Sequence, residues 1–331
     1  MRVINSIYGE FVIEDILKDL IYSKPVQRLK RIHQGGATFL VNKRWNTTRY
    51  QHSIGVMLLI KLLNGSILDQ IKGLLHDISH TAFSHIIDYV YSFNDEDFHE
   101  HFYQKIVRNS EIPDILSKHG YKLEDILNYK CDILEEPLPN LSADRIDYTL
   151  LDMYNLGVIK ENEIKNFLSA LSIKKGKIVI DSIPIAEWFV EIYYKEVIGY
   201  FQHPKNVYSA YIMTKVIREA INRQILKLED LFQDDYYVLE KLVSSNNRVI
   251  IDLLNKLNNK IEVVDNTNDF NISLKHKKRI IDPLIINKNK IIKSSSVSKK
   301  IKMLNQLASR KFENVTCIKR IQDDIDYELF S

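Results

Sequence analysis

The chain has 331 residues, of which 45% are hydrophobic and 27% charged, and its formal net charge at pH 7 is +3. Two cysteines, Cys131 and Cys317, exclude a disulfide framework, and the lack of a CxxC pair argues against a thiolate zinc site. The first residues lack a signal-peptide pattern, and no apolar run approaches the roughly 20 residues that span a bilayer. We therefore expect a soluble, cytoplasmic protein that does not contact membranes.

The chain is expected to be mainly α, with a small amount of β. Its glycine and proline contents, 10 and 7 residues, are low and favour long helices. Apolar residues recur at helical spacing, in chain order, over 14–20, 26–32, 52–63, 67–78, 84–90, 96–107, 144–154, 186–201 and 205–228. A loop with one short strand is predicted for 35–49, further strands at 177–181 and within 280–292, and a mobile loop at 294–296.

The positive charge is concentrated near the C-terminus. Residues 274–320 contain 14 Lys and Arg against two acids, a local excess of 12 positive charges, so the remainder carries −9. This basic region is either the solvated face of a lysine-rich protein or a surface for a polyanion. As a polyanion surface it would contact nucleic acid or the phosphates of a nucleotide.

Three ionisable groups end an otherwise apolar helix in the segment Gly73-Leu-Leu-His76-Asp77-Ile-Ser-His80. The spacing predicts that His76 and His80 share a helix face, with Asp77 beside them. Burying such groups costs several kcal/mol unless they are paired or bound to a metal. Each residue alone is better explained as a hydrogen-bonded core side chain or a helix cap.

Two further residues complete a mixed ligand set. His52 starts an apolar helix, and Asp144 opens the string Asp-Arg-Ile-Asp-Tyr before another apolar run. Two imidazoles and two carboxylates suit a divalent ion such as Mn, Mg, Fe or Zn, and leave coordination positions for water and phosphate oxygens. We predict one divalent metal ion held by His52, His76, Asp77 and Asp144.

An ordered set of motifs extends beyond these ligands. The strings RYQHSIGV, LLHDISHTAFSH, FHEH and DRIDY follow one another, flanked by PVQRLKRIHQGGATFLV, YFQHP and KKRIIDPLII. Together they resemble the HD-domain deoxynucleoside triphosphate triphosphohydrolases, which include bacterial dGTP-hydrolysing enzymes and the vertebrate enzyme with a sterile-alpha-motif domain. The resemblance implies a helical HD core over 1–215, a mixed helical and basic C-terminal subdomain over 216–331, and a homo-oligomer.

The resemblance also implies roles for individual residues. The same four metal ligands match, and His80, with His99 and Glu100, resembles the catalytic histidine and its supporting pair. His85 and Asp88 match positions near the scissile α-phosphate, and their spacing lets them form a hydrogen-bonded pair. This catalytic set would position or activate the attacking water.

Nucleotide binding is implied for five further residues. Arg49 and Arg145 match phosphate-binding positions, and their planar guanidinium groups suit phosphate oxygens. Gln34 and Asp152 resemble positions that bind the deoxyribose 3′-hydroxyl, although a surface polar pair is the alternative explanation. Tyr148 matches the ring that crowds the 2′ position and thereby excludes ribonucleotides.

Three positions depart from the family pattern. A leucine against the base is replaced by Gly35, an arginine on the terminal phosphate by Tyr193, and a tyrosine near the base by Phe201. The lost arginine contact is worth roughly 1.5–3 kcal/mol. Lys195 or a basic residue of the C-terminal region would have to replace it.

Three functions therefore remain open from the sequence. The first is hydrolysis of deoxynucleoside triphosphates to deoxynucleoside and tripolyphosphate. The second keeps the HD chemistry but acts as a phosphodiesterase or nuclease on single-stranded or cyclic nucleotides, with the basic region as its polyanion surface. The third is a nucleotide-sensing or nucleic-acid-binding protein without turnover, against which the intact His80, His99 and Glu100 argue.

Overall fold

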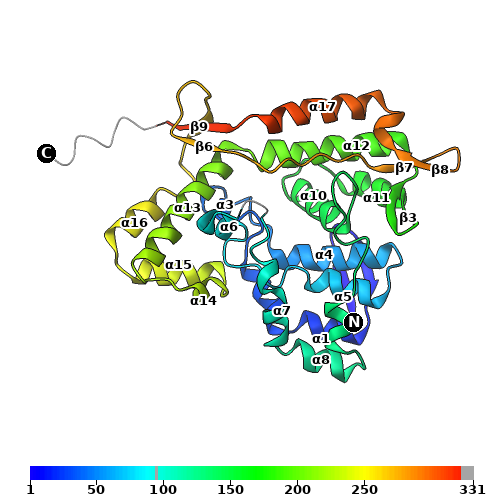
Figure 1. Ribbon diagram of the computed structural model, residues 1–331, viewed down its shortest axis with the longest axis horizontal. Helices are drawn as coiled ribbons and strands as arrows, with labels where there is room; N and C mark the ends of the chain where they lie inside the picture. The colour runs from blue at the N-terminus through cyan, green and yellow to red at the C-terminus, as the bar shows by residue number, and fades with distance from the viewer. Residues whose placement is uncertain (94–95, 322–331) are drawn as a thin grey trace.

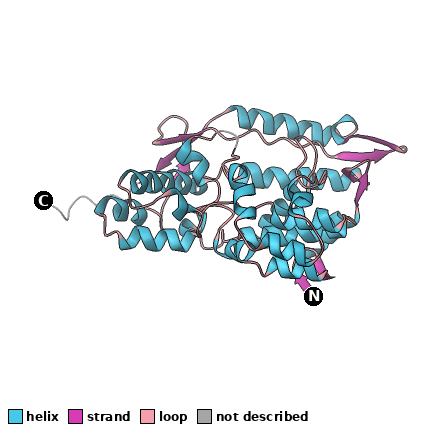
Figure 2. Cartoon of the chain, turned by 60° about the horizontal axis from the view of Figure 1, so that its bottom comes forward, coloured by secondary structure: helices cyan, strands magenta, loops and turns pink. Residues whose placement is uncertain are grey.

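The computed structural model describes residues 1–93 and 96–321, and helices dominate both views of it (Figures 1 and 2). Strands form three small sheets at the periphery of the helical body. The predicted class, mainly α with a little β, is confirmed. Within the described residues, no helix combines the length and apolar character needed to cross a membrane.

The centre of the molecule is built on α4 (Arg49–Leu62), which packs against α5 (Ile67–Leu75) and α10 (Ala143–Asn155). Every residue from His52 to Ile60 is buried, so α4 is covered on all sides. A helix that is apolar all round belongs in a protein interior. The first residues of α4 and α5 are fixed by capping boxes at Thr48 and Ser66.

The remaining helices surround this centre (Figure 1). They are α1 (Asp15–Ile21), α2 (Lys24–Arg28), η1 (Leu29–Arg31), α3 (Thr38–Val41), α6 (Ile86–Tyr91), α7 (Glu100–Arg108), α8 (Ile112–Lys118), α9 (Leu123–Leu127), α11 (Glu161–Ser169), α12 (Ile183–Tyr194), the π-helix η2 (Lys195–Tyr200), α13 (Pro204–Asn222), α14 (Leu228–Leu231), α15 (Asp235–Ser244), α16 (Arg248–Asn255), η3 (Ser294–Ser296) and α17 (Lys299–Glu313).

The sheets tie the C-terminal part of the chain to the rest. β1 (Arg2–Asn5) and β2 (Gly9–Val12) form a hairpin. A four-stranded sheet has the order β3 (Leu171–Lys174), β4 (Lys177–Ile180), β7 (Leu284–Asn287) and β8 (Lys290–Lys293), and a three-stranded sheet the order β5 (Val263–Asp265), β9 (Thr316–Arg320) and β6 (Ile272–Leu274). Because β6 and β7 belong to different sheets, the segment between them crosses from one sheet to the other.

The helix predicted over 67–78 ends at Leu75, so the prediction that His76 and His80 share a helix face is wrong. The backbone N–H groups of Ile78 and His80 donate to carbonyls three residues back, which tightens the chain into turns. The side chain of Asp77 accepts a hydrogen bond from Arg49, a residue of α4. The next helix, predicted from residue 84, begins at Ile86.

The strand predicted within 35–49 is wrong, because the segment contains the short helix α3 and one isolated β-bridge between His33 and Thr48. The bridge closes the loop, and Gly36, with φ +66°, turns the chain so that α3 packs against α13. The predicted strand within 280–292 is present as β7 and β8. The mobile loop predicted at 294–296 is instead η3, whose Ser294 and Ser295 are hydrogen-bonded to Asp282.

Candidate metal centre and active-site cavity

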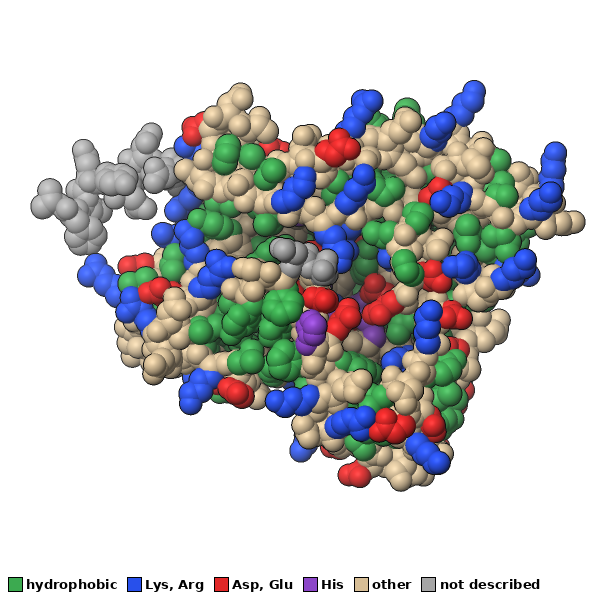
Figure 3. All heavy atoms as spheres, viewed as in Figure 1, with side chains coloured by type: hydrophobic (Ala, Val, Ile, Leu, Met, Phe, Trp, Pro, Cys, Tyr) green, Lys and Arg blue, Asp and Glu red, His purple; other side chains and the backbone are tan. Residues whose placement is uncertain are grey.

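One cavity of about 480 Å³ collects the predicted site residues, and its size is typical of small-ligand pockets. Every residue predicted for the site except Asp88 lines it. These are Gln34, Arg49, His52, His76, Asp77, His80, His85, His99, Glu100, Asp144, Arg145, Tyr148 and Asp152. In Figure 3 acidic and histidine side chains meet in the central hollow of the molecule, with basic side chains on its upper side.

Three of the four predicted metal ligands form a tight group. His52, His76 and Asp144 each offer a ligand atom, and these atoms lie within 4.8 Å of one another. His52 Nε2 is 3.0 Å and His76 Nε2 is 3.8 Å from the same Asp144 oxygen, Oδ1. α4, the end of α5 and the first turn of α10 therefore converge on one point.

Asp77 lies beside this group. Its Oδ1 is 3.4 Å from His76 Nε2, and its Oδ2 is 3.8 Å from His52 Nε2. Burial by itself raises the pKa of Asp77, but Arg49 and the neighbouring histidines outweigh it and hold the pKa well below its usual range. Asp77 is therefore an ionised, buried carboxylate directed at the same point.

The state of His76 fits a metal ligand. Its Nδ1 donates to the carbonyl oxygen of Gly73 at 2.8 Å, which leaves the lone pair on Nε2 facing the cavity. That Nε2 atom is buried and has no hydrogen-bond partner among the described residues. A buried polar atom without a partner is costly unless something binds it. The imidazoles of His52 and His76 and the carboxylates of Asp77 and Asp144 together form a ligand set that suits a divalent cation.

Asp147 orients His52, a role that the sequence analysis missed. His52 Nδ1 donates to Asp147 Oδ2 at 2.7 Å, and the Tyr8 hydroxyl donates to Asp147 Oδ1 at the same distance. Gly55 makes room for this carboxylate, since a Cβ there would lie 2.0 Å from Asp147 Oδ1. The available signal was the i, i+3 spacing of Asp144 and Asp147, which places both on one face of a helix.

Asp147→Asn should weaken binding of a divalent cation by about 10- to 100-fold. An amide can donate or accept a hydrogen bond, so it no longer fixes His52 in the tautomer that carries the proton on Nδ1. Titration of the chelator-treated protein with Mn²⁺, followed by calorimetry, measures the effect. Asp132→Asn, at an exposed carboxylate, is the matched control. Equal affinities in the wild type and the Asp147 variant would show that this carboxylate does not orient the ligand.

A second cluster of imidazoles stands next to the metal ligands. His80 and His99 stack with ring centroids 3.7 Å apart, and ring nitrogens of His80, His85 and His99 lie within 4.8 Å of one another. Burial lowers the pKa of both stacked rings, that of His99 to about 3, and the charge of Arg49 adds to the effect. This set contains no carboxylate, whereas the first group combines imidazoles with a carboxylate, as the predicted ligand set does.

The structure explains how the second cluster is positioned. His85 Nδ1 and Asp88 Oδ2 are 3.0 Å apart, which confirms the predicted pair. Asp88 itself is buried behind His85, and its other oxygen accepts a hydrogen bond from the backbone of Phe98. Asp88 therefore links His85 to the turn that carries His99 and Glu100, and it acts from outside the cavity.

The turn between His80 and His85 has an uncommon backbone. Phe83 and Ser84 have φ values of 59° and 52°, in the left-handed region that costs a non-glycine residue energy. The Phe83 N–H donates to Asp235 Oδ1 at 2.6 Å, and the Ser84 hydroxyl donates to the His33 carbonyl at 2.7 Å. These contacts hold a strained turn that places both histidines at the cavity.

The predicted nucleotide-binding residues occupy the walls. Arg49 donates to Asp77 and to Ser84 Oγ, whereas Arg145 is oriented by carbonyl oxygens of the loop before α10. Burial raises the pKa of Asp152 to about 6. Gln34 Oε1 is buried without a hydrogen-bond partner in the described part of the chain.

The structure shows where the residues connected with the missing arginine lie. Tyr193 is fully buried and does not line the cavity, and Lys195 is an exposed residue paired with Glu191. Arg279, from the segment between β6 and β7, lines the cavity and forms an ion pair with Glu96. Of the two predicted replacements for the missing arginine, the C-terminal one is therefore at the site. Arg279 stands in the string KKRIIDPLII, which was part of the resemblance, but the sequence assigned no role to it.

Comparisons with known proteins agree with this geometry. The HD domain family model matches residues 49–148, which hold all four predicted ligands. Bacillus subtilis YdhJ is 47% identical over 321 residues, covering 96% of this chain and 99% of that protein. Metal-dependent phosphohydrolase cns2 of Cordyceps militaris is 36% identical over 169 residues, 50% of this chain and 49% of its own length.

A more distant relative and a solved structure also match the chain. Zebrafish (Danio rerio) deoxynucleoside triphosphate triphosphohydrolase SAMHD1 is 27% identical over 222 residues, 51% of this chain and 36% of that protein. The crystal structure of a phosphohydrolase from Bacteroides thetaiotaomicron has the same fold, with a TM-score of 0.69 at 19% identity over 92% of this chain and 97% of that one. The chain therefore belongs to the HD-domain family of metal-dependent phosphohydrolases.

Proposed function

We propose that the chain hydrolyses deoxynucleoside triphosphates at the α-phosphate, releasing deoxynucleoside and tripolyphosphate, with one divalent cation held by His52, His76, Asp77 and Asp144. One observation carries the proposal: a single cavity is lined by a metal-ligand set, a histidine cluster, three arginines and a Tyr-Asp-Gln group. The phosphates, the reacting phosphorus and the sugar of the substrate would therefore each meet side chains of suitable chemistry within one cavity. The distant likeness to a named triphosphohydrolase supports the same substrate.

The phosphate chain would lie against the basic wall. Arg49, Arg145 and Arg279 all line the cavity, and Lys277 lies beside Arg279 on the same segment. Guanidinium groups bind phosphate oxygens through two parallel hydrogen bonds, which suits a chain of three phosphates. Arg279 would supply the contact that the family obtains from the position of Tyr193.

In the proposed reaction a water oxygen forms a bond to the α-phosphorus, the bond from that phosphorus to the 5′-oxygen breaks, and the 5′-oxygen takes up a proton. A bound divalent cation supplies Lewis acidity, which polarises phosphoryl oxygens and lowers the pKa of water. His80, stacked on His99 and 3.3 Å from Asp77, would orient the attacking water. His85, held by Asp88, would face the leaving 5′-oxygen.

Residues of α10 on the cavity wall would select the sugar. Tyr148 and Asp152 lie one helical turn apart and both line the cavity, with Gln34 on the facing loop. The Tyr148 ring would occupy the space that a 2′-hydroxyl needs, and ionised Asp152 would accept a hydrogen bond from the 3′-hydroxyl. Such a site discriminates strongly, because a wrong hydroxyl leaves buried polar groups unpaired.

Tyr148→Ala should narrow the preference for deoxynucleotides over ribonucleotides by about tenfold, while lowering deoxynucleotide hydrolysis less. The measurement compares kcat/KM for dGTP and GTP in both proteins. Tyr154→Ala, on the same helix but outside the cavity, is the matched control. Equal kcat/KM for dGTP and GTP in the wild type would rule out sugar selection here.

A second function is favoured by the basic region. Exposed basic side chains lie along the upper part of the molecule in Figure 3, over α17 and the segment before it. A single-stranded nucleic acid bound there could present a phosphodiester to the same cavity. Incubation with each dNTP, NTP and a labelled single strand, with Mn²⁺ or Mg²⁺, separates the alternatives by product. Tripolyphosphate supports the triphosphohydrolase, nucleoside monophosphates support the phosphodiesterase, and no product supports a silent sensor.

A further inference from the structure

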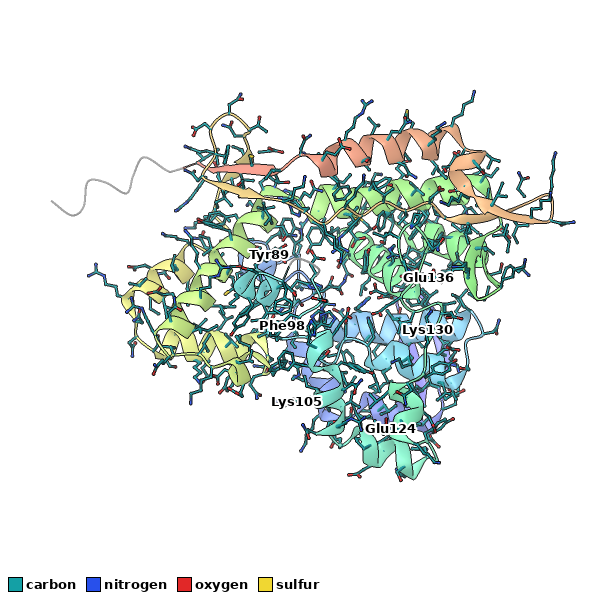
Figure 4. The ribbon with its side chains drawn as sticks, in the orientation of Figure 1. Tyr89, Phe98, Lys105, Glu124, Lys130 and Glu136 are labelled. Carbon is teal, nitrogen blue, oxygen red and sulfur yellow. The ribbon has the colours of Figure 1, made fainter. Side chains whose placement is uncertain are left out.

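A second carboxyl group lies behind the α10 wall of the cavity. Asp152, on α10, lines the cavity, whereas Glu196, on η2, is fully buried and does not line it. α10 packs against α12 and its continuation η2 (Figure 1), and side chains from the two sides meet between these helices in Figure 4. The carboxyl groups of Asp152 and Glu196 lie within hydrogen-bonding reach of each other.

Glu196 is placed by a π-helical turn. α12 ends at Tyr194, and in η2 the Phe201 N–H donates to the Glu196 carbonyl, five residues back, at 2.9 Å. Lys195 is exposed, while Glu196, the next residue, has no exposed surface. Turns of this kind are rare and occur frequently at functional sites. η2 therefore directs an acidic side chain into the interior, beside α10.

The carboxyl group of Glu196 has few polar neighbours. Neither of its oxygens has a hydrogen-bond partner in residues 1–93 and 96–321. The Thr149 hydroxyl lies near them, but its oxygen also lacks a partner in these ranges. A buried carboxylate without a donor is very unfavourable, and two adjacent buried carboxyl groups cannot both ionise. Glu196 and Asp152 must therefore hold one proton between them.

The proton belongs on Glu196. Burial, together with the negative charge of Asp152, raises the pKa of Glu196 well above its usual range. Burial raises the pKa of Asp152 only to about 6, because the Thr47 side chain opposes it. Near pH 7 Glu196 is thus a neutral acid that can donate a hydrogen bond, and Asp152 is an anion that can accept one.

We infer that Glu196 is a positioning residue, whose protonated carboxyl group donates to Asp152 and holds that carboxylate ready to accept the 3′-hydroxyl of the substrate; this rests on the proposed function. A donor on the far side of the Asp152 carboxylate keeps it from turning away from the ligand. Binding side chains need such support to stay in a productive orientation. Glu196 acts only through Asp152, since it does not line the cavity.

The test compares kcat/KM for dGTP with that for 2′,3′-dideoxyguanosine triphosphate, which differs only in lacking the 3′-hydroxyl. Glu196→Met keeps the approximate size of the side chain but cannot donate, whereas Glu196→Gln restores a donor through its amide. We expect Glu196→Met to lower the preference for dGTP by about 2- to 12-fold, as for one hydrogen bond, and Glu196→Gln to keep it. Glu191→Met, the same change at an exposed neighbour paired with Lys195, is the matched control and should leave the preference unchanged.

A double variant shows whether Glu196 acts through Asp152. Asp152→Ala alone should remove the preference for dGTP, and adding Glu196→Met to it should change the ratio no further. A general loss of stability would lower the rates on both nucleotides alike and leave their ratio unchanged. The ratio therefore reports on the contact with the 3′-hydroxyl.

The outcomes distinguish this inference from the proposed function. If the wild type hydrolyses dGTP, but Glu196→Met keeps the wild-type ratio or Glu196→Gln loses it as fully as Glu196→Met, the inference is overturned alone. Equal kcat/KM for the two nucleotides in the wild type also overturns it, because Asp152 would then make no contact with the 3′-hydroxyl. If the wild type hydrolyses no dNTP, the proposed function falls and the inference falls with it.

Discussion

Asp77→Ala should abolish both the bound divalent cation and the hydrolytic activity, lowering kcat/KM by more than about 100-fold, since losing a ligand costs more than losing the group behind it. The carboxylate is buried and ionised between His52, His76 and Arg49. Removing it leaves the buried Arg49 charge without its partner and takes one negative charge away from the group that would hold the cation.

Metal analysis of the purified variant, alongside its rate on dGTP, measures this effect. Asp132→Ala, at an exposed carboxylate, is the control and should keep both metal and activity. We expect the variant to fold, because the ligand cluster is one part of a large core. Circular dichroism checks that it does. A folded Asp77→Ala protein with a full complement of metal and wild-type activity would disprove the ligand assignment.

His80→Ala should separate chemistry from binding. We expect kcat to fall by about 10²- to 10⁴-fold, while metal content and nucleotide affinity stay at wild-type levels. The reason is its position: His80 contacts Asp77 and stacks on His99, but it lies outside the group of ligand atoms that contains His52, His76 and Asp144.

Calorimetric titration with a slowly hydrolysed dNTP analogue and metal analysis provide the two binding measurements. His101→Ala removes an exposed histidine from the same region and should match the wild type throughout. Should metal content collapse together with the rate, His80 would itself be a metal ligand, and the division between the two clusters would be wrong.

The sequence predicted the long helices better than the segments between them. α4 and α10 carry apolar residues over several turns, so their periodicity was sufficient. The segment from His76 to His85 was misjudged because its path depends on distant partners: Arg49 holds Asp77, and Asp235 holds the turn at Phe83. Hydrogen bonds to residues far along the chain produce no periodic pattern in the sequence.

The same distinction applies to the site. That the four predicted ligands lie together could be predicted, because histidines and aspartates in or beside apolar helices are costly to bury without a partner. Asp147 was overlooked, although its spacing from Asp144 was a usable signal. The role of Arg279 could not be assigned, although it lies in the matched string KKRIIDPLII, because only the crossing of the chain between β6 and β7 brings this basic segment to a cavity lined mostly by residues 34–152.

Hydrolysis of a dNTP in water enriched in ¹⁸O tests the central claim most directly. Attack of water on the α-phosphorus must place the label in tripolyphosphate and leave the deoxynucleoside unlabelled, and the reaction must stop when the divalent cation is chelated. Mass spectrometry of both products reads the result. Release of pyrophosphate with a deoxynucleoside monophosphate, or label in the deoxynucleoside, would contradict the account.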